Sequence, residues 1–208
     1  MKIAIDLNDV LRNFTQNFAK YYIQNYDHTF NMDDFTPYTN QIEILYPFKT
    51  QRAFEVFTYS DYAYELFGAC PACNNRLAGL LNEWLDVKVP NIDTEDPIEF
   101  IIVSAKEYGL SIPSSSFFLA KMGIKIREYY YPTDSLKIWD KCDVLITANP
   151  DLLNNKPEGK VAVRIEQEYN EECPYDLTYL NMMTFLNDEN NVEKIKEKYG
   201  REICGVQQ

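Results

Sequence analysis

Residues 1–14 read MKIAIDLNDVLRNF, a stretch in which a short apolar run meets acidic and amide side chains. Residues 3–5 are continuous and apolar, which is typical of a strand that is buried on both faces of a parallel sheet. Asp6 follows this run directly, and Asn8 and Asp9 come soon after it. The stretch therefore predicts a buried strand that delivers polar groups to one edge of a sheet.

The composition bounds the size and the partners of the protein. The 208 residues are 46% hydrophobic and 14% aromatic, enough for one domain with an inserted subdomain and a substantial core. The formal net charge of −12 argues against a nucleic-acid polymer as the partner, because binding a phosphate backbone requires a surplus of Lys and Arg. A small phosphorylated molecule needs only a local cluster of donors and remains compatible with this charge.

The sequence also predicts a protein of the cytoplasm. No apolar stretch reaches the length of a transmembrane helix, and the first residues lead into a strand rather than a signal peptide, so no membrane is expected as a partner. An odd number of cysteines favours reduced thiols. The five are Cys70, Cys73, Cys142, Cys173 and Cys204. The oligomeric state is not indicated.

Apolar strands and helical patterns alternate along most of the chain. After the first strand, further strands are predicted at residues 97–105, 124–131, 142–150 and 160–166. Helices are predicted near residues 14–22, 71–85, 113–123, 177–186 and 191–200. This order favours an α/β fold with a mostly parallel sheet that is covered by helices on both faces.

Ligands of such folds bind beyond the carboxyl ends of the strands. Polar residues follow three of the predicted strands, within residues 6–9, 104–106 and 147–151. We therefore expect a binding site where these three segments meet.

Several segments together resemble the haloacid dehalogenase (HAD) superfamily, and within it the 5′(3′)-deoxyribonucleotidase-like phosphatases. The first strand ends in Asp6, and a second ends in the sequence IIVS at Ser104. Lys137 lies six places before Asp143, which opens a strand that is followed by Asn149 and a proline. The likeness covers about residues 1–20 and 70–155.

The resemblance implies a HAD-like Rossmannoid sheet sandwiched by helices, with an inserted and mainly helical cap. The core domain would comprise residues 1–12 and 97–208, and the cap residues 13–96. A cap in this position would close over the site at the end of the first strand.

The resemblance also implies roles for individual residues. Asp6 matches the nucleophile that forms an aspartyl-phosphate and also helps to hold Mg²⁺, whereas Ser104 and Lys137 match the residues that hold the phosphoryl group. Without the resemblance, each has an ordinary interpretation. Asp6 could cap a turn or a helix, Ser104 could be a hydroxyl at a strand end, and Lys137 could be a solvated surface lysine.

The sequence departs from the family pattern at the positions of the acid–base catalyst and the metal ligands. Asn8 replaces the aspartate that protonates the leaving group, and Thr147 and Ala148 replace the acids that hold Mg²⁺. Asp9 and Asn149 are further candidates for the pocket, although the Asp9 side chain is expected to point elsewhere. General acid–base catalysis typically contributes about 10²–10⁴-fold, so weak Mg²⁺ binding and weak or absent phosphatase activity are predicted.

Three functions stay open, and so does the question whether the protein is an enzyme. It could be a degenerate HAD-like protein that binds a phosphorylated small molecule. It could be an active Mg²⁺-dependent phosphatase of the nucleotidase kind, acting through Asp6. As a minor alternative it could be a metal-free hydrolase of the dehalogenase kind, because residues 147–151 (TANPD) faintly resemble the last motif of those enzymes.

Cys70 and Cys73 form a C-x-x-C pair just before a predicted helix. Such pairs can be redox-active, since a helix N-terminus lowers the pKa of a thiol. Thioredoxin-like pairs, however, follow a strand within a βαβ unit, and this pair falls within the insert. The preferred interpretation is two inert structural cysteines.

Overall fold

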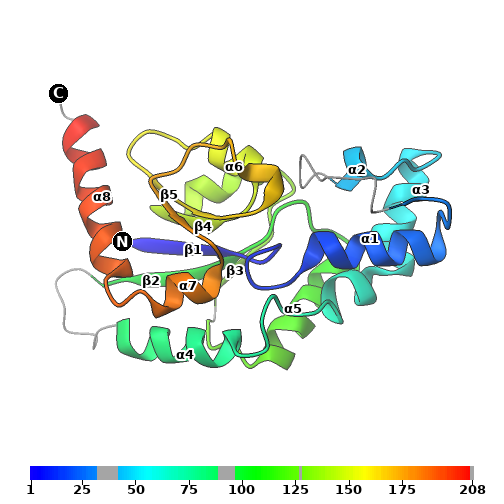
Figure 1. Cartoon of the computed structure of the whole chain (residues 1–208), viewed down its shortest axis with the longest axis horizontal. Coiled ribbons are helices and arrows are strands. Elements are labelled where there is room, and N and C mark those ends of the chain that lie inside the picture. The colour runs from blue at the N-terminus through cyan, green and yellow to red at the C-terminus, as the bar shows by residue number, and fades with distance from the viewer. Residues whose placement is uncertain (32–41, 89–96, 127, 207–208) are drawn as a thin grey trace.

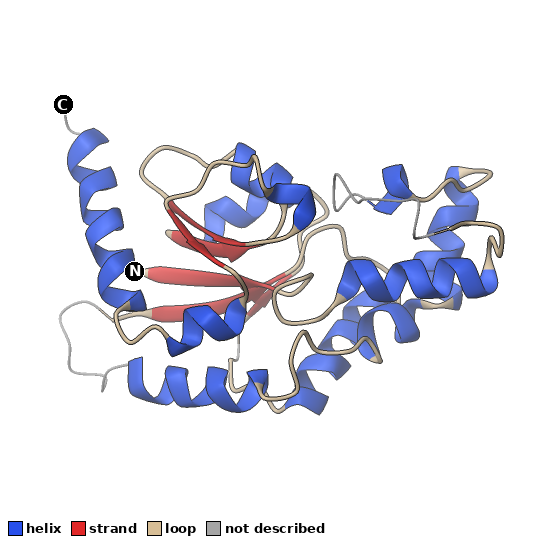
Figure 2. Ribbon diagram, viewed as in Figure 1, coloured by secondary structure: helices blue, strands red, loops and turns tan. Residues whose placement is uncertain are grey.

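The computed structural model of the chain describes residues 1–31, 42–88, 97–126 and 128–206, without the side chains of residues 44 and 201–206. The described residues form an α/β fold around one sheet (Figures 1 and 2). The sheet has the strand order β3-β2-β1-β4-β5-β6, and all of its neighbouring strands are parallel. Its strands are β1 Lys2–Asp6, β2 Glu99–Val103, β3 Tyr129–Tyr130, β4 Val144–Thr147, β5 Val161–Ile165 and β6 Leu177–Tyr179.

Helices cover both faces of this sheet. The α-helices are α1 Phe14–Asn25, α2 Ile42–Leu45, α3 Gln51–Val56, α4 Leu77–Lys88, α5 Ser111–Met122, α6 Pro150–Asn154, α7 Met182–Asn187 and α8 Asn191–Val206. Short π-helical and 3₁₀ segments add η2 Phe57–Asp61, η3 Tyr64–Gly68, η4 Ser135–Lys141 and η5 Glu168–Asn170. In Figure 1, α4 and α7 lie below the sheet and α6 lies above it. None of the helices in the described ranges is apolar over the length that crossing a lipid bilayer requires.

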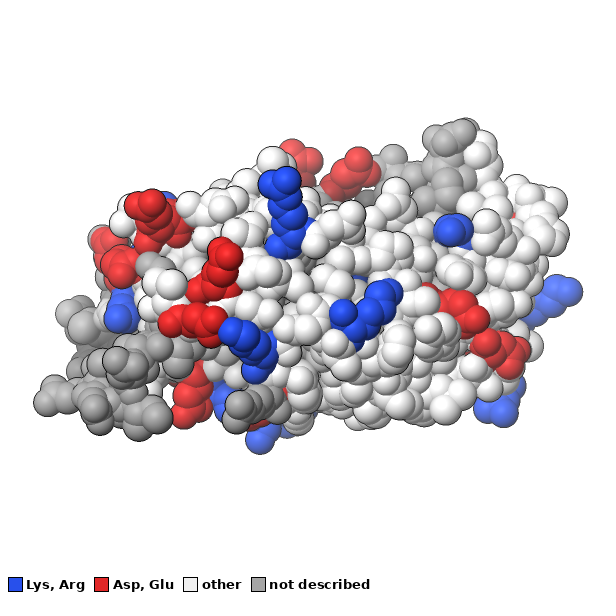
Figure 3. Space-filling view, turned by 90° about the horizontal axis from the view of Figure 1, so that it is seen from below, with Lys and Arg blue, Asp and Glu red and all other residues white. Residues whose placement is uncertain are grey.

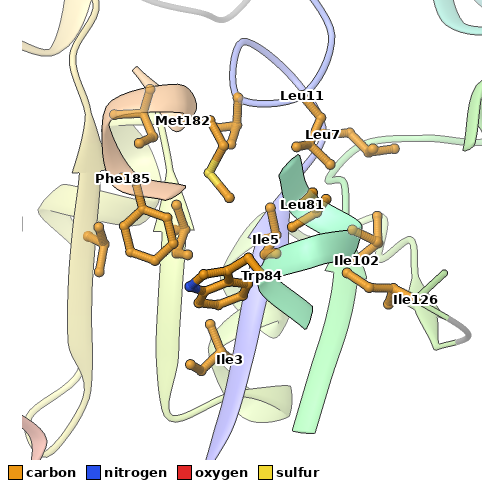
Figure 4. Close-up of a cluster of buried hydrophobic side chains, with 14 of the residues drawn as sticks. Ile3, Ile5, Leu7, Leu11, Leu81, Trp84, Ile102, Ile126, Met182 and Phe185 are labelled. Atoms are coloured by element: carbon orange, nitrogen blue, oxygen red, sulfur yellow. The ribbon is translucent and has the colours of Figure 1, made fainter. Parts of the chain in front are cut away.

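Alternate residues of the strands pack against opposite helical layers, as the pleat of a strand requires. Ile3 and Ile5 belong to the cluster that contains Trp84 of α4 and Phe185 of α7 (Figure 4). Ala4 belongs instead to a cluster on the other face, with residues of η4 and α6. The central strand is therefore buried on both sides, which explains why its sequence is continuously apolar.

A separate aromatic cluster holds the insert together. Its buried members come from α1, α2, α3, η2, η3 and the residue directly after α2, and they include Phe18, Tyr22, Tyr46 and Phe57. In Figure 1 these helices lie beyond the carboxyl end of β1. Helix α4, by contrast, packs on the sheet. The division into a core of residues 1–12 and 97–208 and a cap of residues 13–96 stays a prediction, and this packing places its last helix with the core.

The parallel sheet is confirmed, whereas three local expectations are wrong in detail. The helix expected at 177–186 is strand β6 followed by α7, because Asn181 caps the helix with a hydrogen bond from Thr184 N–H and thereby starts it late. The strand expected at 124–131 is reduced, within its described residues, to the short edge strand β3. The helix expected from residue 71 begins only at Leu77.

Charged side chains do not gather by sign on the face seen in Figure 3. Lys and Arg side chains stand apart from one another there, with acidic side chains on either side of them.

Candidate functional site

A small cavity of about 50 Å³ lies beyond the carboxyl ends of the central strands. The loops after β1, β2 and β4 form one wall, and side chains of the insert form the other. Its lining residues are Asp6, Asn8, Phe14, Ile42, Glu43, Tyr59, Phe67, Ala105, Lys106, Asn149 and Asp151. The structure thus brings together three of the residues selected from the sequence: Asp6, Asn8 and Asn149.

Asp6 ends β1 and is 3% exposed. The Thr147 hydroxyl donates a hydrogen bond of 2.7 Å to Asp6 Oδ2. Burial raises the pKa of the Asp6 carboxyl to about 7, although the hydrogen bond from Thr147 opposes this rise. A large part of the Asp6 carboxyl is therefore protonated at neutral pH, whereas a nucleophile must be ionised.

Thr147 occupies the position at which the family resemblance leads one to expect a metal ligand. Its hydroxyl donates to Asp6 and also accepts a hydrogen bond of 3.0 Å from the backbone N–H of Asn149. The Asn149 side chain in turn accepts from the N–H of Asp151 and caps α6. The end of β4 and the segment after it therefore supply hydroxyl and amide groups that are hydrogen-bonded within this segment and, through Thr147, to Asp6.

Asp9 does not line the cavity. It adopts a left-handed backbone conformation with φ 58°, which turns the chain directly after Asn8. Its carboxylate accepts hydrogen bonds from the Thr15 N–H and hydroxyl and from the Tyr169 hydroxyl. Burial raises the pKa of Asp9, and these hydrogen bonds oppose that effect. Asp9 therefore ties the β1 loop to the start of α1 and to η5.

Ser104 follows β2 and is fully buried beside the end of β1, where Asp6 pairs with Val103. No group in the described part of the chain forms a hydrogen bond with the Ser104 hydroxyl. An unpaired buried hydroxyl costs about 1–3 kcal/mol, and Ser104 itself does not line the cavity. The next residue, Ala105, lines the cavity.

The lysine that reaches the cavity is Lys106 rather than Lys137. Lys137 lies in η4 with a side chain that is 61% exposed, and its ammonium is 3.6 Å from Asp140. Lys106 lines the cavity and forms an ion pair of 2.6 Å with Glu43 of the insert. The sequence does contain a signal for Lys106, since it lies two residues after Ser104 in a strand-end segment.

The donor set does not fit a dedicated Mg²⁺ site. Among the residues that the structure describes, no group of three or more His, Cys, Asp or Glu side chains is placed to hold a metal ion. Asp6 and Asp151 line the cavity, but Ala148 has no donor, and Asp9 is engaged by Thr15 and Tyr169. Mg²⁺ prefers a near-octahedral set of carboxylate and water oxygens, and the end of β4 carries Thr147 and Ala148, neither of which has a carboxylate.

A second and larger cavity, of about 270 Å³, adjoins the first. The two share Glu43, Tyr59 and Lys106. The Tyr59 and Tyr108 rings lie 3.8 Å apart between centroids, with an interplanar angle of 33°. The site therefore has a small polar inner chamber and a wider outer chamber with an aromatic wall, and the Lys106–Glu43 pair lies between them.

The Cys70–Cys73 pair is separate from this lining. Both cysteines carry free thiols and precede α4 by several residues. Burial raises the pKa of Cys70 to about 12, and it also raises that of Cys73. A redox-active pair requires the opposite shift, so the structural interpretation remains the better one.

These features define a class of fold before any relative is considered. A parallel sheet with helices on both faces, a polar cavity beyond its carboxyl edge and an insert after the first strand make a Rossmann-like α/β fold.

Comparisons with known proteins agree with this class. No family model matches the sequence, and no curated protein matches it either. The structure is similar to that of a protein of Burkholderia xenovorans LB400 that is described as a haloacid dehalogenase-like hydrolase. The sequence identity is 10%, the match covers 93% of this chain and 97% of the other, and the TM-score is 0.59. The likeness shows a HAD-like fold.

Proposed function

We propose that this chain is a HAD-like hydrolase relative, akin to the deoxyribonucleotidases, that binds a phosphorylated small molecule and has weak or no Mg²⁺-dependent phosphatase activity. One observation carries the proposal. At the end of β1, the buried Asp6 carboxyl is held by the Thr147 hydroxyl, in a cavity that Lys106 enters.

The inner chamber provides the donors that a phosphoryl group requires. The Lys106 ammonium supplies the positive charge, in place of the lysine that the resemblance suggested at 137. Ser104, whose hydroxyl is buried and unpaired at the end of β2, stays a proposed neutral donor, although Ala105 is the residue that lines the cavity there. Hydrogen bonds from charged groups to phosphate are stronger than those from neutral groups, so Lys106 is expected to contribute most to the affinity. Glu43 pairs with Lys106, so an anion bound in the chamber would compete with Glu43 for the ammonium.

The same chamber lacks the groups that turnover requires. Asn8 cannot donate or accept the proton of a leaving group as a carboxyl does, so the general acid and base is missing. Burial raises the pKa of the Asp6 carboxyl to about 7, so only part of it is ionised, and able to act as a nucleophile, at neutral pH. The residues that the structure describes form no dedicated Mg²⁺ site, so they do not provide the transition state with the charge stabilisation that a metal supplies.

The outer chamber accommodates the rest of the ligand. Its wall contains Phe54, Tyr59 and Tyr108, and Gln51 adds a polar group. Aromatic side chains favour flat ring systems, which stack on them. The preferred ligand is therefore a phosphorylated molecule with a planar group, a class that includes nucleotides.

Metal-free hydrolysis of the dehalogenase kind is the second candidate function. The observation that favours it is that Thr147, rather than a metal ligand, contacts Asp6, while Asn149 and Asp151 line the same cavity. Release of halide from 2-haloacids tests this candidate directly, and it is independent of phosphate.

The test combines a binding assay with an activity screen. Inorganic phosphate and a nucleotide panel are titrated by calorimetry, and phosphate release from the panel is measured with and without Mg²⁺. The variants are wild type, Asp6→Asn and the double variant Thr147→Asp/Ala148→Asp. We expect binding without turnover in wild type, and a gain of Mg²⁺ binding in the double variant. Mg²⁺-dependent turnover by wild type that disappears in Asp6→Asn would contradict the proposal.

A further inference from the structure

Arg12 is fully buried directly behind the cavity and uses its whole guanidinium fork. Its Nε donates to Asn8 Oδ1 at 2.8 Å, and one terminal nitrogen donates to Glu107 at 2.6 Å. The other terminal nitrogen donates to the Ser115 hydroxyl at 2.6 Å and to the Phe67 carbonyl at 3.1 Å. The guanidinium is therefore fixed from several directions.

The contact with Arg12 determines which way the Asn8 amide faces. A guanidinium only donates hydrogen bonds, so it is the amide oxygen of Asn8 that must face it. The Asn8 nitrogen then faces away from Arg12. Asn8 lines the cavity, and no residue in the described part of the chain accepts a hydrogen bond from Asn8 Nδ2.

We propose that Arg12 is a positioning residue that aims the Asn8 amide N–H group into the cavity, where it donates to an oxygen of the bound phosphoryl group. This inference rests on the proposed function and deepens it, because it assigns position 8 to anion binding. In the phosphatases that this chain resembles, this position carries the acid–base carboxyl. In this chain the same position thus carries a group that donates a hydrogen bond to phosphate.

The surroundings of Arg12 make this orientation rigid. Glu107 is as deeply buried as Arg12, and its second oxygen accepts from the Ser115 hydroxyl, which closes a ring of hydrogen bonds. The Phe67 and Phe14 rings lie 5.0 and 5.5 Å from the guanidinium carbon. Arg12 therefore joins the β1 loop, the β2 loop, α5 and the insert, and the Asn8 amide has a fixed direction.

The same contact leads us to expect that an acid at position 8 would not by itself restore acid catalysis. A carboxylate there would accept from Arg12, and a nearby positive charge favours its ionised form. An ionised carboxylate has no proton to give to a leaving group, and it repels a phosphoryl anion. An amide at this position avoids both effects and provides a donor.

NMR spectroscopy with inorganic phosphate as the probe tests the inference. The side-chain amide signal of Asn8 is assigned by its loss in Asn8→Asp. In wild type we expect this signal to shift as phosphate is added. In Arg12→Lys we expect the shift to be lost, while the backbone signals of the sheet show that the variant is folded.

The binding constants supply a second readout that does not depend on the stability of the Arg12 variant. We expect Asn8→Asp to bind phosphate at least about tenfold more weakly than wild type, because a like charge replaces a donor. The matched control is Asn13→Asp, the same substitution at a residue outside the cavity lining. The control is expected to bind within about twofold of wild type.

The outcomes separate the inference from the proposed function. If wild type binds no phosphate, the proposed function fails, and the inference fails with it. If wild type binds phosphate but Asn8→Asp binds it equally well, or the Asn8 amide signal does not respond, only the inference is overturned.

Discussion

The buried polar residues around the end of β1 form two groups with opposite hydrogen-bonding states. In the locked group, Asp9, Arg12 and Glu107 have several internal partners each. In the pocket group, the Ser104 hydroxyl has no partner in the described chain, and the Asp6 carboxyl is held by a single side chain, Thr147. Members of both groups follow the same two strands: Asp6, Asp9 and Arg12 lie at and after the end of β1, and Ser104 and Glu107 lie after β2. Polarity and burial alone therefore do not distinguish the two groups, which differ in how fully their side chains are paired within the protein.

This comparison predicts that substitutions in the locked group reduce stability, whereas substitutions in the pocket group change binding or even increase stability. The largest effect is expected for Glu107→Ala. It leaves the buried Arg12 charge without its partner, which costs about 3–5 kcal/mol of unfolding free energy. Chemical denaturation measures the loss.

A control separates this effect from the general loss of an ion pair. Glu99→Ala removes an exposed partner of Lys2, at 3.9 Å, and is expected to cost less than about 1 kcal/mol. Equal losses for Glu107→Ala and Glu99→Ala would show that the buried network is not a scaffold.

The next effect concerns Asp6→Asn and has the opposite sign. The folded-state pKa of Asp6, about 7, lies above its ordinary value of 3.8, so the folded protein loses stability as pH rises from about 4 to 7. An asparagine lacks this penalty and still accepts from Thr147. The difference in the free energy of unfolding between the variant and wild type should grow over that range. At pH values above 7 it should reach at most about 4 kcal/mol in favour of the variant.

Denaturation at a series of pH values measures the gain. Asp61→Asn, at an exposed aspartate, is the control and should follow wild type at every pH. A difference between Asp6→Asn and wild type that does not change between pH 4 and 8 would mean that Asp6 ionises normally.

A smaller effect is expected for Tyr169→Phe in the locked group. This change removes one donor from the buried Asp9 carboxylate and should cost about 1–3 kcal/mol. Phosphate affinity should stay unchanged, because Tyr169 does not line the cavity. A loss of phosphate affinity without a loss of stability would place Tyr169 in the other group.

The smallest effect distinguishes two lysines by position. Lys106→Ala should weaken phosphate binding about tenfold, the size of one charge-assisted hydrogen bond. Lys137→Ala removes the same charge from an exposed place on η4 and should leave affinity unchanged. Weaker phosphate binding by Lys137→Ala, with unchanged binding by Lys106→Ala, would instead support Lys137 as the phosphate-binding lysine that the family resemblance implies.

The sequence was sufficient for the sheet and for part of the site. The continuous apolar runs that became β1, β2, β4 and β5 could be read directly, because a strand buried on both faces needs no alternation. The topological rule for parallel sheets then placed Asp6 and Asn149 at the right edge.

The remainder of the site depends on contacts between distant segments. Arg12 forms hydrogen bonds with Phe67, Glu107 and Ser115, which are 55 to 103 residues away in the sequence. No local sequence pattern therefore predicts this network. The choice between Lys106 and Lys137 depends on the backbone, since Lys106 follows β2 in a left-handed conformation with φ 58° and Lys137 falls on an exposed 3₁₀ segment. Strand β6 was missed because a three-residue strand is too short for a periodic signal.

Calorimetric titration of inorganic phosphate at pH 6 and pH 8, with and without Mg²⁺, tests the central claim most directly when wild type is compared with Asp6→Asn. The account predicts that Mg²⁺ changes the affinity of wild type by less than about twofold. It also predicts that Asp6→Asn binds more tightly than wild type at pH 8 but similarly at pH 6, because the carboxyl that repels phosphate is largely ionised only at the higher pH. Phosphate binding that requires Mg²⁺ and is lost in Asp6→Asn would contradict the account and indicate a working metal-dependent phosphatase site.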